Sequence, residues 1–224
     1  MIDDPRLAEL GQFTPEGHLQ PGYGDHYVFF VGRDDCHGIL HHLIPQERLL
    51  FKLNMFGYDD DELNADIMGL FDDPAVHVQA TLDRSQAGGV HERKIVEFDQ
   101  QTNSEDFNYS FAIGHSETHQ ISHTKGGILV GQGIGFEGSM NWSDSGEGTG
   151  ISLRADVANP AGFKAQNNTL MVSTNPVFLS RFGARLDVEH RVAVQQAHDR
   201  SLRDIAKRAA AAATAPRAVR SAVR

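Results

Sequence analysis

The stretch LLFKLNMFGYDDDELNADIMGLFDDPAVHVQATLDRSQ, residues 49–86, decides the fold. Residues 49–56 and 76–82 are short, mostly apolar runs typical of strands, and the segment between them repeats its apolar residues at helical spacing. Residues 59–61 provide N-cap chemistry for that helix. A strand, a helix and a second strand within about 35 residues predict a βαβ unit with two parallel strands.

Further elements surround this unit on both sides. The segments expected to form strands are 26–31, 107–113, 120–124 and 170–172. The Gly-rich stretch 126–136 predicts two short strands around a tight turn. The segments expected to form helices are 38–48, 90–98 and a long one that begins at Pro176. The sequence therefore predicts an α/β protein with a mixed, largely parallel sheet flanked by helices.

The two ends of the chain differ from its middle. Residues 1–25 are rich in Gly and Pro and are expected to be an irregular lead-in to one domain, residues 26–198. Residues 199–224 form a basic, Ala-rich tail, helical or disordered, whose last 25 residues carry seven Lys or Arg and one acid. The whole chain has a net charge of -10. Such a tail is compatible with binding to nucleic acid, to an anionic membrane or to the acidic body, but we favour a solvated helix.

Composition is ordinary for a soluble globular protein, with 40% hydrophobic and 22% charged residues. The sequence shows neither an apolar run long enough for a transmembrane segment nor a secretory signal. The single cysteine, Cys36, rules out an internal disulfide and is typical of a reducing compartment. We therefore expect a cytoplasmic protein.

Residues 123–143, HTKGGILVGQGIGFEGSMNWS, carry the chemistry. His123 and Lys125 are two residues apart, so on a strand an imidazole and an ammonium group would converge on one phosphate. Ser139 and Asn141, also two apart, would donate hydrogen bonds to the same phosphate from the neighbouring strand end.

This segment resembles the HKD motif of the phospholipase D superfamily, H-x-K-x4-D followed by G-S-x-N. The positions that match it are His123, Lys125, Gly138, Ser139 and Asn141. Residues 49–86 are similar to the family's opening strand–helix–strand, and residues 174–190 are similar to its closing helix. The resemblance thus covers most of the chain and implies phospholipase D-like αβα layers.

The resemblance also implies an activity, a metal-independent phosphodiesterase that uses no cofactor. His123 would attack phosphorus to form a covalent phosphohistidine, and Lys125 would stabilise the phosphoryl oxygens. A catalytic site of this family needs two copies of the motif and this chain has one, so a homodimer is implied. Nucleic acid is the expected substrate. The alternatives are a hydrolase of phospholipid head groups and a catalytically impaired member that binds phosphate.

Two positions depart from the family pattern. Val130 stands where the motif has its Asp, which is usually a supporting group. Many single-motif members place a Glu after GSxN to orient the histidine. Glu147 is the candidate here, although Ser152 stands closer to the expected position.

Two further sets of residues have alternative interpretations. Asp83, Arg84 and Gln86 would either line the substrate pocket from a strand-end loop or anchor that loop through an Asp–Arg pair. A second set, spaced four residues apart, would bind zinc if it lay on a helix: His115, His119 and His123. The Gly, Ser and Thr residues between these histidines disfavour a helix, so we predict no metal site.

Overall fold

The computed structural model describes residues 2–86, 109–116, 118, 120–149, 151, 161–162 and 164–214, without the side chains of 109–111 and 208–214. Its strands are β1 (His26–Phe30), β2 (Leu50–Met55), β3 (His77–Asp83), β4 (Tyr109–Gly114), β5 (Lys125–Leu129), β6 (Ile134–Gly138) and β7 (Thr169–Ser173). Its α-helices are α1 (Pro5–Ala8), α2 (Cys36–Leu43), α3 (Asp61–Phe71), α5 (Asp144–Glu147) and α6 (Pro176–Thr214). Short 3₁₀ helices are η1 (Glu9–Phe13), η2 (Ile44–Gln46) and η3 (Arg84–Gln86).

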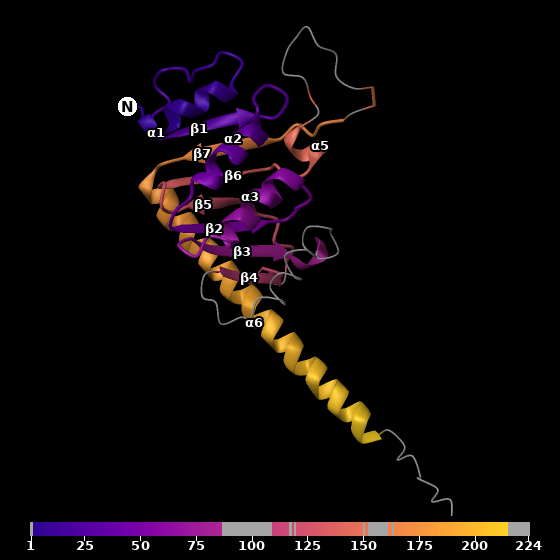
Figure 1. Ribbon diagram of the computed structural model, residues 1–224. Coiled ribbons are helices and arrows are strands. Elements are labelled where there is room, and N and C mark those ends of the chain that lie inside the picture. The colour runs from indigo at the N-terminus through magenta and orange to yellow at the C-terminus, as the bar shows by residue number, and fades with distance from the viewer. Residues whose placement is uncertain are drawn as a thin grey trace, which may run out of the picture.

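The described strands form one mixed sheet in the order β1-β7-β6-β5-β2-β3-β4 (Figure 1). The predicted βαβ unit is confirmed, because β2 and β3 pair in parallel across α3. Parallel pairing is limited to β2, β3 and β4, and the other four neighbouring pairs are antiparallel. The sheet is therefore mixed, as predicted, with β2, β3 and β4 as its parallel part, and β5 and β6 form the predicted hairpin.

Helices cover both faces of the sheet, with α2 and α3 on one face and α6 along the other (Figure 1). Side chains alternate between the two faces of the sheet along β2, and Phe51 and Leu53 are buried in the main hydrophobic core on one face. Between them, Lys52 points to the opposite face and donates to Asp187 of α6 over 2.7 Å. The beginning of α3 is also as predicted, because the N-cap carboxylate of Asp60 accepts from the backbone N–H of Leu63.

Some predicted boundaries differ from the structure. The strand expected over 120–124 begins only at Lys125, because hydrogen bonds from loop groups hold the preceding residues. The lead-in 1–25, expected to be irregular, contains α1 and η1, which bury Leu7 and Leu10 completely. The division expected between residues 198 and 199 falls inside the continuous helix α6, which projects beyond β4 (Figure 1).

The helix expected over 90–98 and the last ten residues of the tail lie outside the described residues. Within the part of the chain that the structure describes, no helix has the length and apolar character needed to cross a membrane.

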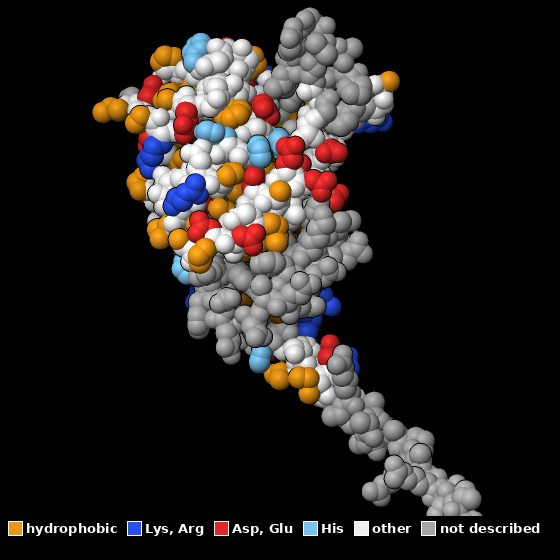
Figure 2. Space-filling model, viewed as in Figure 1, with side chains coloured by type: hydrophobic (Ala, Val, Ile, Leu, Met, Phe, Trp, Pro, Cys, Tyr) orange, Lys and Arg blue, Asp and Glu red, His pale blue; other side chains and the backbone are white. Residues whose placement is uncertain are grey.

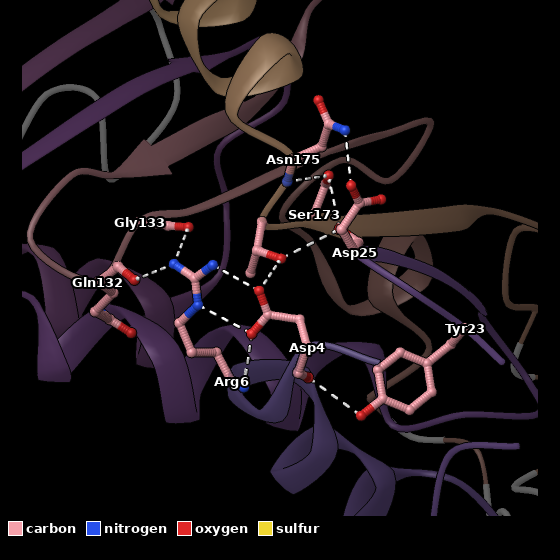
Figure 3. A network of polar contacts seen from close by, with 9 residues as sticks. Asp4, Arg6, Tyr23, Asp25, Gln132, Gly133, Ser173 and Asn175 are labelled. Carbon is pink, nitrogen blue, oxygen red and sulfur yellow. Dashed lines mark hydrogen bonds and ion pairs between the residues drawn. The ribbon is translucent and has the colours of Figure 1, made fainter. Parts of the chain in front are cut away.

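The N-terminal segment is tied to the sheet by a network of polar contacts (Figure 3). The Asp4 carboxylate accepts from Arg6 Nη2 over 2.6 Å and from Thr174 Oγ1 over 2.7 Å. Arg6 in turn donates to the carbonyl oxygen of Gly133, at the turn between β5 and β6, over 3.2 Å. Asp4 therefore connects α1 to both the hairpin and the approach to α6.

This network predicts a pH-dependent contribution to stability. The hydrogen bond from Arg6 holds the pKa of Asp4 well below the ordinary value of 3.8. A lowered pKa in the folded state stabilises the protein above about pH 4, and this contribution is lost as the pH falls below that value. We expect Asp4→Asn to lose about 2 kcal/mol of unfolding free energy at pH 7, with the difference shrinking towards pH 3. Urea unfolding at both pH values measures it.

Glu16→Gln is the matched control, since Glu16 is an exposed carboxylate whose side chain makes no ion pair among the described residues. A difference between Asp4→Asn and the native chain that stays constant from pH 7 to pH 3 would contradict the ionic origin of the contribution.

Candidate active site

The candidate site lies where the carboxyl ends of β2 and β3 meet the beginning of β5. In the antiparallel pair, Met55 at the end of β2 is opposite Lys125 at the start of β5. Parallel β2 and β3 end at the same edge of the sheet, so Asp83 belongs to this edge as well. Open α/β sheets bind ligands at such an edge because loops there bring side chains from several strands together.

His123 is exposed and lies just before β5, and buried polar groups form hydrogen bonds with the residue that precedes it. The Asp83 carboxylate, fully buried, accepts from the backbone N–H of Ser122 over 2.6 Å. The Ser122 hydroxyl donates to Asn54 Oδ1 over 3.2 Å. Asn54 and Ser122 were not singled out in the sequence, although Asn54 is a polar residue near the end of an apolar strand. Together these contacts fix the backbone that carries the imidazole.

Phe56 brings the two motif residues to one place. Its ring centroid lies 4.5 Å from that of His123 and 4.9 Å from Lys125 Nζ. Lys125 is buried, with 5% of its surface exposed, and its ammonium group donates to the carbonyl oxygen of His123 over 2.9 Å.

The ammonium group of Lys125 is poorly compensated. Burial lowers the pKa of Lys125. Among the described residues no carboxylate forms an ion pair with it, so two of its three protons remain for a ligand. A cation in this state attracts an anion such as a phosphate group.

Gly138 and Ser139 lie at the end of β6, beside the beginning of its antiparallel partner β7. The Ser139 hydroxyl donates to Asn168 Oδ1 over 3.0 Å and accepts from the backbone N–H of Thr169 over 3.1 Å. A Cβ at Gly138 would lie 2.0 Å from the carbonyl oxygen of Thr169, so the strands can approach this closely only at a glycine. Both motif residues thus have a structural role at this strand end.

Asn141 is held against the loop that follows β2. A Cβ at Gly57 would lie 2.8 Å from Asn141 Cγ, so Gly57 makes room for the amide. The Asn141 Oδ1 atom is buried and has no hydrogen-bond partner among the described residues. Gly57 was missed in the sequence, where a single glycine after a strand reads only as a turn. The unsatisfied Oδ1 atom is an acceptor and would bind a donor of a ligand, whereas only the Nδ2 group of this amide could donate to an anion.

Comparison with known proteins shows which fold carries this arrangement. No protein-family model matches the chain, and no curated protein matches its sequence. The structure is similar to that of NucT from Helicobacter pylori, with a TM-score of 0.55 and 15% identity over 75% of this chain and 96% of that one. Phosphatidylserine synthase from Haemophilus influenzae has a TM-score of 0.52 and 12% identity, over 84% of this chain and 43% of its own. The chain has the phospholipase D-like fold.

Glu147, expected as the carboxylate beside His123, has another partner in this phospholipase D-like chain. Its Oε2 contacts Nδ1 of His37 in α2, and no contact with His123 is present among the described residues. Burial raises the pKa of Glu147 to about 7, against the effect of the His37 hydrogen bond. Burial lowers the pKa of His37, but hydrogen bonds to Glu147 and Glu62 outweigh it and raise that pKa to about 9. His37 was missed, because nothing near it in the sequence points to Glu147.

The loop after β3 separates the three residues that were considered together. Asp83 is buried and accepts from Ser85 N–H over 2.8 Å, whereas Arg84 is exposed and forms no pair with it. Gln86 is half-buried in η3. The alternative in which an Asp–Arg pair anchors the loop is therefore wrong, while a role for these residues in substrate binding stays a prediction.

The zinc interpretation required a helix through His115, His119 and His123. His115 and His123 lie in non-helical segments, and His119 lies outside the described residues. The Nδ1 atom of His115 lies 3.7 Å from Oδ2 of Asp83, so His115 is close to the carboxylate that holds the Ser122 backbone. A helical metal-binding stripe is not formed by the described part of this segment.

Val130, at the position of the motif's Asp, lies at the other end of β5 from Lys125. Its N–H donates to the carbonyl oxygen of Leu50 at the start of β2. Five residues of strand place it about 16 Å from Lys125, beyond the reach of the candidate site. The turn between β5 and β6, which follows Val130, is held by the buried carboxylate of Glu47, which accepts from the N–H of Gly131 over 3.0 Å. A contact between Val130 and His123 or Lys125 is therefore not expected.

Proposed function

We propose that this chain is a metal-independent phosphodiesterase, a nuclease-like hydrolase of nucleic acid that forms a covalent phosphohistidine at His123. One observation carries the proposal. A buried lysine ammonium that has no carboxylate partner among the described residues lies beside an exposed histidine, in a phospholipase D-like fold. A buried charge of this kind is costly unless it has a partner, and the oxygens of a phosphodiester would supply one.

The proposed reaction takes two displacements. An imidazole nitrogen of His123 attacks phosphorus, the P–N bond forms, and the bond from phosphorus to the leaving oxygen breaks. A second histidine protonates that oxygen, then removes a proton from water as the water attacks phosphorus and the P–N bond breaks. Lys125 holds the phosphoryl oxygens in both steps, and the Nδ2 group of Asn141 donates to them when it is turned towards the phosphate.

The second histidine has to come from another copy of the chain. The motif occurs once in the sequence, so a homodimer with the two sites facing each other would complete the chemistry. The exposure of His123 supports this arrangement, because an imidazole at the rim of the sheet is accessible to a second subunit.

The experiment compares substrates and looks for the covalent intermediate. Full-length protein in EDTA is incubated with single-stranded DNA, duplex DNA, RNA and phosphatidylcholine vesicles. An alkaline quench and peptide mass spectrometry then follow the peptide that contains His123. We expect cleavage of nucleic acid, a phosphoryl adduct on His123, and neither in the His123→Asn variant.

His42→Ala provides the control for loss of a histidine elsewhere. Head-group release from the vesicles without nucleic-acid cleavage would show that the substrate is a phospholipid and not nucleic acid, with the same proposed mechanism. Equal cleavage by the native chain and His123→Asn would overturn the proposal.

A further inference from the structure

A second cluster of chemically active side chains lies beside the candidate active site, where α2, α3 and α5 meet. His37 comes from α2, Asp60 is the N-cap of α3, and Glu147 ends α5. One ligand atom from each of the three lies within 4.8 Å of the others. His37 Nδ1 contacts Glu147 Oε2 and lies 3.7 Å from Asp60 Oδ2. The opposite ring nitrogen lies 2.9 Å from Glu62 Oε2.

One oxygen of this cluster lacks a partner. The side chain of Glu147 has no exposed surface, and its Oε1 atom has no hydrogen-bond donor among the described residues. A buried carboxylate oxygen without a donor costs about 1–3 kcal/mol or more, so a structure that keeps one has a reason to do so. The helical caps and turns around it do not supply that donor.

Negative charge around the cluster exceeds what His37 can neutralise. The surrounding pocket has a volume of about 320 Å³. Its lining residues are Asp35, His37, Asp59, Asp60, Asp61, Glu62, Asp144 and Thr149. The described lining residues include no Lys or Arg, and Figure 2 shows acidic side chains gathered beside histidines on this face. A protonated His37 would offset one of these charges, which leaves a strong attraction for a cation.

We propose that His37, Asp60 and Glu147 bind one divalent cation of the Mn²⁺ or Zn²⁺ class, with Glu62 as a further ligand from the rim. One imidazole nitrogen with several carboxylate oxygens is a ligand set that these ions accept, whereas Ca²⁺ prefers oxygen alone. Ligands that share an ion at about 2.1 Å lie about 3–4 Å from one another, so the three side chains need only small shifts.

The cation would act beside the phosphodiester chemistry and not within it. Asp60 follows Phe56 by four residues, so the Cα atoms of these two residues lie within about 14 Å of each other, and the Phe56 ring contacts His123. Neutralising this acidic rim would reduce the repulsion that a polyanionic substrate meets as it approaches. The cation site itself does not depend on the proposed activity.

Metal binding by the full-length protein tests the proposal. After EDTA treatment and gel filtration, the free Mn²⁺ signal in electron paramagnetic resonance is followed as protein is added, and Zn²⁺ is tested by competition. We expect one Mn²⁺ per chain, displaced by Zn²⁺, and a higher Tm when metal is added. Glu147→Gln and Asp60→Asn should weaken binding by at least about 100-fold and abolish the rise in Tm.

Two features of the variants keep the test decisive. Asparagine is a good N-cap, so Asp60→Asn retains the hydrogen bond to Leu63 while removing charge from the cluster. His41→Ala is the matched control, since His41 stacks on His37 and pairs with Asp66 outside the cluster. His123→Asn should bind the cation as the native chain does, which separates this result from the proposed activity.

If the native chain binds less than one equivalent of Mn²⁺ and of Zn²⁺, or binds them no more tightly than folded Asp60→Asn and Glu147→Gln, the cluster is only a buried imidazolium–carboxylate contact between helices.

Discussion

Lys125→Met is expected to lower phosphodiester turnover by about 10²–10³-fold while leaving the free energy of unfolding unchanged or higher. Burial lowers the pKa of Lys125, and among the described residues no carboxylate offsets its charge. Folding therefore gains little from the ammonium group, because a buried cation without an anionic partner is costly. A bound phosphate gains much from it, since the charge lies ready before the substrate arrives. Methionine preserves most of the volume of the side chain.

Lys52→Met is the matched control, because Lys52 lies on the neighbouring strand and is also largely buried. Lys52 Nζ is bonded to both oxygens of Asp187, at 2.7 and 2.8 Å. Its loss should lower stability and leave turnover unchanged, the reverse of the result at Lys125. The two variants are compared by kcat/KM in EDTA and by urea unfolding. Turnover close to that of the native chain in Lys125→Met, or a loss of stability as large as in Lys52→Met, would contradict a phosphate-binding role.

Features that depend on residues close in the chain could be predicted from the sequence. The βαβ unit and the hairpin were predictable because alternation, caps and turn glycines act between residues close in the chain. The His123 and Lys125 pair was found because its members are two residues apart. The prediction that both lie on one strand is wrong, since β5 begins at Lys125 and His123 lies before it. Phe56, which directly follows β2, contacts both side chains.

Contacts between distant parts of the chain could not be predicted in this way. Glu147 was assigned to a histidine 24 residues earlier, but its partner is His37, which is 110 residues away. That contact depends on where α2 and α5 lie above the sheet, and hence on β1 pairing with β7. The Asp83 carboxylate likewise reaches Ser122 across 39 residues. No local periodicity encodes either distance, because both follow from the order of the strands.

Gly138→Ala is expected to lower the free energy of unfolding by about 3 kcal/mol. The added Cβ would lie 2.0 Å from the carbonyl oxygen of Thr169 and 2.9 Å from its carbonyl carbon, and both atoms belong to the backbone. A flexible side chain could move aside, but this backbone is held by pairing on both edges of β7. The substitution must therefore separate β6 from β7.

The same separation would reach the candidate site. The N–H of Ser139 donates to the Thr169 carbonyl over 3.1 Å, so the clash would displace Ser139 and the residues that lead to Asn141. We therefore expect turnover to fall together with stability. Gly69→Ala is the control, because Gly69 lies in α3 with nothing within 4 Å of an added Cβ. Alanine there should raise stability by about 0.5–1 kcal/mol. Urea unfolding of both variants measures the difference, and a Gly138→Ala protein as stable as Gly69→Ala would mean that the close approach of β6 and β7 is not required.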